Sequence, residues 1–174
     1  MGFDHYEPDT IEKIGDQVVG LRVDTSVLAN LTYWHQDQWE LFNVFGVVKV
    51  NYLFAESLVI DGAPGATILQ LNFTSTVPAV AGLQAISAVS LTLATLVVGD
   101  RIRWLGTGVG TALVLTGAPG ITPGDNVLPM ILGTEGGTAT IGMVTTVADA
   151  TSGSHQWSLF YEPMSDGAYV SAVL

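Results

Sequence analysis

The residue types that most often carry out chemistry are sparse in this chain and do not stand at a known catalytic spacing. His5, His35 and His155 are its three histidines, and no two of them have the spacing of paired metal ligands. His35 and Asp37 would share one face of a strand and could hold a cation, but a solvated edge or loop is the favoured interpretation. We interpret His155, two residues before Trp157, as an interface or surface histidine rather than a catalytic base.

Nucleophile and phosphate motifs are also missing from the sequence. The absence of cysteine excludes a thiol nucleophile and a cysteine-ligated metal, and no Gly-x-Ser-x-Gly elbow occurs. The stretch GTGVGTA at 106–112 has Thr111 where a dinucleotide loop needs its third glycine, and a strand rather than a helix follows. The acids are scattered, and several of them stand beside a glycine as turn residues do, among them Asp61, Asp100, Asp125 and Asp166. We therefore expect no enzyme, no cofactor and no metal ion.

The charge balance is strongly acidic, with 16 Asp and Glu against five Lys and Arg and a net charge of −11. Binding to phosphates requires clustered basic side chains, and the basic residues of this chain form no run: Lys13, Arg22, Lys49, Arg101 and Arg103. We predict neither direct nucleic-acid binding nor attraction to an anionic membrane. Residues 77–98 carry no charge and are long enough to span a bilayer. Polar residues are interspersed among them, so we attribute the lack of charge to the general composition of the chain rather than to a membrane span.

A cluster of aromatic residues is the remaining signal for binding. Tyr33, Trp34 and Trp39 stand close together, with Phe42 and Phe45 just behind them. Such clusters can stack on a sugar or form the centre of a protein interface. The two phenylalanines can equally well fill the core, whereas the polar neighbours of the tryptophans predict partial exposure. We predict Tyr33, Trp34 and Trp39 as partner contacts.

Strand patterns occupy most of the chain, separated by turns rich in Gly, Pro and Asp. Period-2 alternation and β-branched residues indicate half-buried strands, and a short helix is possible around 79–90. The pattern predicts an all-β fold, an antiparallel β-sandwich or jelly-roll-like barrel of about 8–10 short strands. Predicted strands lie near 17–23, 39–50, 52–60, 66–76, 111–117, 126–132, 138–147, 155–163 and 168–174.

The first residues differ from the rest of the chain in composition. Residues 1–13 are acidic and polar and read as an N-terminal arm, in which Phe3 and Tyr6 are isolated aromatic anchors for a partner. Residues 14–174 suit a single β-sandwich domain. Because its strands carry little charge, exposed sheet edges would aggregate. A closed homo-oligomer would cover them.

The C-terminal stretch carries a family resemblance. It has a strand with an aromatic beside Tyr-x-Pro, Trp157–Pro163, then Asp166-Gly167-Ala168 and a last short strand. With LFNVFGVVKV at 41–50 and VVGDRIRWLGT at 97–107, this pattern resembles small structural proteins encoded in the head gene clusters of tailed bacteriophages. The resemblance covers roughly residues 38–174. It consists of strands and turn residues rather than a catalytic signature.

The resemblance implies a virion protein, made in the host cytoplasm, that decorates the capsid surface. Such a decoration or cement protein would be a homotrimer with the major capsid protein as its partner. A phage tail, neck or fibre component has the same sequence features. A carbohydrate-binding β-sandwich module, stacking a sugar on Trp34 and Trp39, is the other alternative.

Overall fold

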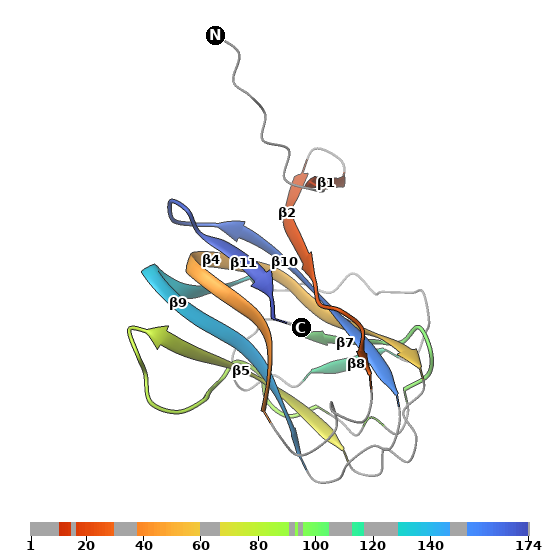
Figure 1. Ribbon diagram of the computed structural model, residues 1–174. Helices are drawn as coiled ribbons and strands as arrows, with labels where there is room; N and C mark the ends of the chain where they lie inside the picture. Colours follow the sequence, from red (N-terminus) through yellow and green to blue (C-terminus); the bar gives the residue numbers. More distant parts are fainter. Residues whose placement is uncertain are drawn as a thin grey trace.

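The computed structural model describes residues 11–14, 17–29, 38–59, 67–90, 93, 96–104, 113–116, 129–146 and 153–173. This part of the chain is nearly all antiparallel strand with essentially no helix, which confirms the all-β, sandwich-like prediction (Figure 1). Its strands are β1 (Ile11–Ile14), β2 (Gln17–Asp24), β3 (Leu28–Ala29), β4 (Gln38–Val59), β5 (Ile68–Val77), β6 (Gln84–Ala85), β7 (Arg101–Trp104), β8 (Val114–Thr116), β9 (Met130–Thr146), β10 (Ser154–Pro163) and β11 (Tyr169–Ala172).

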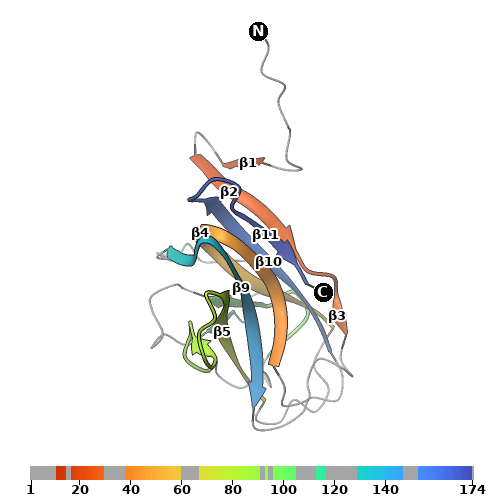
Figure 2. The same cartoon turned by 60° about the vertical axis from the view of Figure 1, so that its left-hand side comes forward.

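Strand β4 organises the whole sheet. Its first half pairs with β9 and β11, and its second half pairs with β10 and β7 (Figure 2). The two halves of the sheet therefore share β4. The first half consists of β11, β4, β9, β5 and β6, and the second consists of β1, β2, β3, β10, β4, β7 and β8. The prediction of two strands, 39–50 and 52–60, was wrong. Asn51 is an extra residue in the β4–β10 ladder, a bulge rather than a turn.

The bend in β4 is centred on Gly46. The β4–β9 ladder shifts between Phe45 and Val47, and Gly46 has a φ of 70°. A Cβ atom at this position would lie 2.8 Å from the Ser165 hydroxyl oxygen and 2.9 Å from the Ala168 Cβ. Both the left-handed backbone and the lack of space require glycine here. The bulge lets β4 leave one half of the sheet and enter the other.

The C-terminal segment follows β4 along most of its length. Strand β10 pairs with the second half of β4 and β11 with the first half, both antiparallel. The turn between them, residues 164–168, lies against the Gly46 bulge. Two hydrogen bonds attach it: Met164 N donates to Val47 O at 2.8 Å, and Val47 N donates to Ser165 Oγ at 3.0 Å. Strands β10 and β11 therefore complete the sheet along β4.

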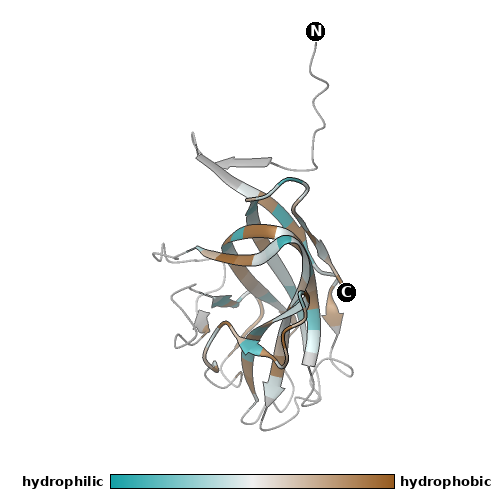
Figure 3. Cartoon of the chain, turned by 90° about the vertical axis from the view of Figure 1, so that its left-hand side faces the viewer, coloured by the Kyte–Doolittle hydropathy of each residue, from teal (hydrophilic) through white to brown (hydrophobic). Residues whose placement is uncertain are grey.

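One hydrophobic core joins the two halves. It contains Leu69 and Leu71 of β5 as well as Trp157 and Leu159 of β10, so the inner faces of both halves pack together. Apolar and polar positions alternate along the strands, as the sequence pattern predicts (Figure 3). The largest fully buried side chains are Trp104, Trp157, Phe42, Leu41, Leu53, Leu69, Leu71, Leu93, Ile102 and Leu113.

The short helix that the sequence left possible around 79–90 does not form, because this segment runs along the outer edge of β5 as extended and irregular chain. Serine hydroxyls pair with the edge: Leu71 N donates to Ser87 Oγ and Leu69 N to Ser90 Oγ, both at 2.9 Å. Serine side chains that bond to nearby backbone compete with helix formation. This edge of the sheet is thus covered by the chain itself.

Candidate functional site

Most of the predicted contact residues lie outside the described residues, so their roles stay predictions; they are Phe3, Tyr6, Tyr33 and Trp34. The possible cation pair His35 and Asp37 lies outside them too. Trp39 is described: it stands opposite Met143 of β9 and is half-buried against the core. Partial exposure of Trp39 is therefore confirmed.

The two phenylalanines behind the tryptophans lie on opposite faces of β4. Phe42 is fully buried in the core. Phe45 is half-buried and stacks on Tyr169 of β11, with ring centroids 4.3 Å apart and an interplanar angle of 14°. Tyr169 is itself exposed. This aromatic pair holds the last strand against β4.

A second aromatic cluster lies on the outer face of the second half of the sheet. Tyr52 and Phe54 of β4 and Phe160 of β10 have ring centroids 5.4 to 6.4 Å apart. Phe54 and Phe160 are almost fully buried, yet they do not belong to the core cluster. Their chain neighbours Leu53 and Leu159 do. Because strand neighbours point to opposite faces, the aromatic cluster lies on the side away from the core.

Arginines cover this aromatic cluster. The Arg22 guanidinium carbon lies 5.6 Å from the centroid of the Phe160 ring, and that of Arg101 lies 5.1 Å from the centroid of the Phe54 ring. Both are cation–π distances. Arg103 stands opposite Phe54 in the β4–β7 ladder. All three arginines of the chain therefore meet here, on a surface that we call the arginine face: Arg22, Tyr52, Phe54, Arg101, Arg103 and Phe160.

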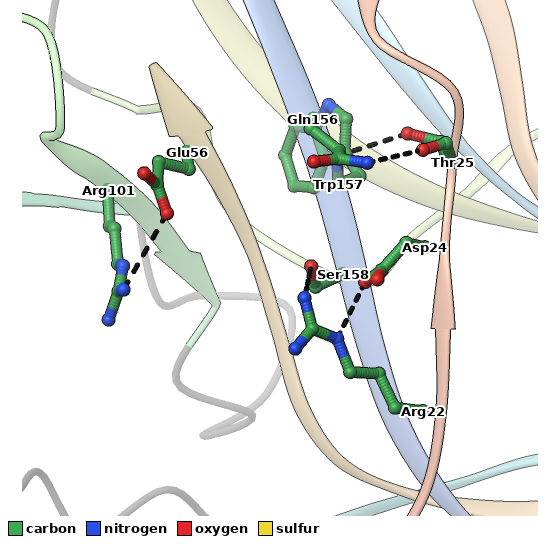
Figure 4. A network of polar contacts seen from close by, with 8 residues as sticks. All are labelled: Arg22, Asp24, Thr25, Glu56, Arg101, Gln156, Trp157 and Ser158. Carbon is green, nitrogen blue, oxygen red and sulfur yellow. Dashed lines mark hydrogen bonds and ion pairs between the residues drawn. The ribbon is translucent and has the colours of Figure 1, made fainter. Parts of the chain in front are cut away.

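Carboxylates alternate with these arginines. Arg22 Nε lies 2.8 Å from Asp24 Oδ1, and an Arg101 guanidinium nitrogen lies 3.6 Å from Glu56 Oε2 (Figure 4). Arg22 also donates to Ser158 Oγ at 3.5 Å. These side chains are all partly exposed except Ser158, so the ion pairs orient the arginines and contribute little to stability. The alternation of signs makes the face unlike a continuous phosphate-binding stripe.

Thr25, just after β2, fixes the position of Arg22 and Asp24 beside β10. Trp157 N donates to Thr25 Oγ1 at 3.1 Å, and Thr25 N donates to Trp157 O at 2.9 Å. Gln156 Nε2 donates to Thr25 O at 3.0 Å (Figure 4). Thr25 therefore extends the β2–β10 pairing by one residue, through its side chain as well as its backbone.

A further charged group continues the outer face along β4 and β10. Asn51 Nδ2 donates to Glu162 Oε1 at 2.7 Å, and Lys49 Nζ lies 3.2 Å from Glu162 Oε2. The hydrogen bond from Asn51 is the main cause that lowers the pKa of Glu162. Burial acts in the opposite direction, and the hydrogen bond and charge of Lys49 lower the pKa further. The Glu162 carboxylate thus stays ionised to more acidic pH than usual.

The charges of this outer face contrast with those of the rest of the chain. It holds four basic side chains, Arg22, Lys49, Arg101 and Arg103, against three acidic ones, Asp24, Glu56 and Glu162. The face therefore has a net charge of +1. Since the whole chain has −11, all other residues together have −12. Sequence reasoning missed this surface because its arginines are scattered along the chain.

The second exposed feature is the segment from Thr76 to Gln84, which we call the uncharged tip. Its nine residues carry no charge and are all exposed. Three large apolar side chains are included, Val77, Val80 and Leu83, at 53%, 41% and 47% exposure. In Figure 1 this part of the chain loops out from the end of β5, at the lower left. Soluble proteins seldom leave such a concentration of apolar side chains in water without a binding role.

His155 and Asp100 were both assigned a setting from the sequence. His155 was predicted at a surface or interface, and this was wrong: the side chain is fully buried on β10. Core packing explains it, because His155 alternates with the outward-facing Gln156. Asp100 is a turn residue as predicted, and its carboxylate accepts a hydrogen bond of 2.9 Å from Val97 N.

Across the described ranges, no group of three or more His, Cys, Asp or Glu side chains is placed to hold a metal ion. In the same part of the chain, no helix has the length and apolar character needed to cross a membrane. Comparisons with known protein families, curated proteins and solved structures gave no match.

Proposed function

We propose that this chain is a virion structural protein of a tailed bacteriophage, which decorates the outer capsid lattice as a homo-oligomer. The observation that carries a binding role is the uncharged tip. Val77, Val80 and Leu83 expose apolar surface with no charge among the residues around them. Depletion of charge around exposed apolar groups is typical of the centre of a protein interface. An acidic protein could insert such a tip between capsid subunits without bringing its charges into the contact.

The resemblance to phage head proteins supplies the class of partner. Its two main stretches, LFNVFGVVKV and the C-terminal pattern, pair with each other in the fold. They meet at Gly46, where the Ser165 and Ala168 side chains pack on the bulge. The residues that carry the resemblance in these two stretches therefore pair with each other and form the bent part of the sheet. This supports a shared architecture with those proteins.

The proposed mechanism is physical rather than chemical. A trimer that contacts several subunits of the major capsid protein adds binding energy only to the assembled lattice. Separation of the subunits under internal pressure would have to break these contacts first. The net charge of −11 keeps the free protein soluble before it docks.

Light scattering of the purified chain, followed by cosedimentation with DNA-free capsids of the phage that encodes it, tests this proposal. We expect a trimer that pellets with capsids at a saturable ratio. The double variant Val80→Ser/Leu83→Ser should lose this binding. Val27→Ser/Val59→Ser, which changes two equally exposed valines elsewhere, is the matched control and should retain it.

A chain that ignores capsids would contradict the decoration role. Pelleting with isolated tails instead would identify a tail, neck or fibre component. Binding to a glycan array that is lost with Trp34→Ala or Trp39→Ala would favour the carbohydrate-binding module.

A further inference from the structure

On the arginine face, the Arg22 guanidinium has more N–H donors than its contacts with Asp24 and Ser158 use. Arg22 is bound to Asp24 through Nε, and the Arg22 and Asp24 side chains keep 40% and 34% of their surface exposed. A guanidinium has five N–H donors and can bind a second carboxylate while it keeps the first. Tyr52 is only partly buried and offers apolar surface between the charges. The face therefore suits a ligand that combines carboxylates with aromatic rings.

The first ten residues of the same chain have this composition. They contain Asp4, Glu7 and Asp9 with Phe3 and Tyr6, and no lysine or arginine. The segment itself carries a net charge of −3. The rest of the chain outside the arginine face and the neighbouring Lys49 group has a net charge of −9 and would repel such an acidic segment. Charge complementarity therefore points to the arginine face as its resting place.

The segment is attached at the border of the face. Strand β1 runs antiparallel to β2, and Ile11 stands opposite Leu21. Leu21 directly precedes Arg22, so the point of attachment lies within one residue of the arginine face along β2. Ten extended residues reach about 33 Å, whereas crossing from β2 over β10 and β4 to β7 takes roughly 15 Å. The segment is long enough to cross the whole face.

We propose that residues 1–10 dock across the arginine face of their own chain. Their carboxylates bind Arg22 and Arg101, and their aromatic rings pack beside Tyr52. The tether to β1 gives the segment a high effective concentration at the face, which compensates for weak individual contacts. This proposal does not depend on the virion role.

Paramagnetic relaxation in the NMR spectrum tests it directly. The chain has no cysteine, so Gly2→Cys gives one site for a nitroxide label on the full-length protein. We expect the amide signals of Glu56 and Arg101 to lose about half their intensity or more relative to the reduced label, because the tethered segment is present at millimolar effective concentration. Signals at the far edge of the sheet, such as that of Asn72, should keep theirs.

Two variants establish the chemistry. Asp4→Asn/Glu7→Gln in the labelled chain should restore the Glu56 and Arg101 signals. The matched control, Glu135→Gln/Asp166→Asn, removes the same two charge types from exposed positions, on β9 and in the turn after β10, and should leave the broadening unchanged. Arg22→Gln/Arg101→Gln should also restore the signals. Should that variant fail to fold, the pair of acidic variants still decides the question.

Two outcomes would overturn the proposal. Unbroadened signals at Glu56 and Arg101 would show that the segment does not visit the face. A second sample mixes labelled protein without ¹⁵N and unlabelled protein with ¹⁵N. Equal broadening in that mixture would mean that the segment docks on another copy. Capsid binding enters neither readout, so failure here leaves the proposed function untouched.

Discussion

The two faces of the second half of the sheet carry aromatic side chains on neighbouring strands but in different surroundings. On the inner face, Trp157 and Trp104 are buried among leucines and isoleucine. On the outer face, Phe54 and Phe160 are covered by arginine side chains that remain partly exposed. Apolar cover contributes to stability, whereas a charged and partly exposed cover keeps polar groups at the surface, where the docking proposed above would use them. The inner face thus builds the core, and the outer face presents charge to solvent.

The largest effect is expected on the inner face. Trp157→Ala should lower the free energy of unfolding by about 3–5 kcal/mol, because a fully buried indole leaves a cavity that the sheet cannot close. Urea denaturation followed by circular dichroism measures this. A loss below about 1 kcal/mol would mean that the inner face is loosely packed, and the contrast between the faces would disappear.

A smaller effect is expected from the matching change on the outer face. Phe160→Ala removes a ring that contacts Tyr52, Phe54 and the Arg22 guanidinium. We expect a loss of about 1.5–3 kcal/mol, the range for burying one apolar side chain. The same urea experiment compares it with Trp157→Ala. Equal losses would show that the outer cluster is a second core rather than a covered binding surface.

The Glu162 carboxylate on the outer face should make the stability of the fold modestly dependent on pH. The pKa of Glu162 is lowered in the folded chain, so the ionised carboxylate stabilises the fold above its unfolded pKa. That contribution is lost as pH falls through the lower, folded pKa. Melting temperatures of the wild type and Glu162→Gln should therefore differ near neutral pH and converge in acid. A constant difference across this range would contradict the assigned role of Asn51 and Lys49.

The smallest effect on stability is expected at the uncharged tip. Val80→Ser and Leu83→Ser replace side chains that are already exposed in the free protein. Their free energies of unfolding should change by less than about 0.5 kcal/mol, as for most surface substitutions. Thermal denaturation measures the change. A large loss would show that the tip supports the fold, and its exposure would then be no argument for a partner.

Much of the architecture followed from the amino-acid sequence alone. Alternation in segments such as Ile68–Val77 and Ser154–Pro163 predicted strands that the structure contains. The turn chemistry around Asp100 was also read correctly. These features are local, because the period of the side chains and the backbone preferences of turn residues act within a few positions. The sequence likewise predicted that aromatic residues near β4 would differ in burial.

Tertiary structure alone decided how these strands combine. Nothing local distinguishes the bulges at Gly46 and Asn51 from turns, so a single strand β4 was read as two. Serine hydroxyls that bond to β5 replaced the helix expected around 79–90. The arginine face depends on pairing between β2, β10, β4 and β7, which are distant in the chain. Strand pairing of this kind is non-local, so nothing in the sequence indicates that Arg22 meets Arg101 and Arg103.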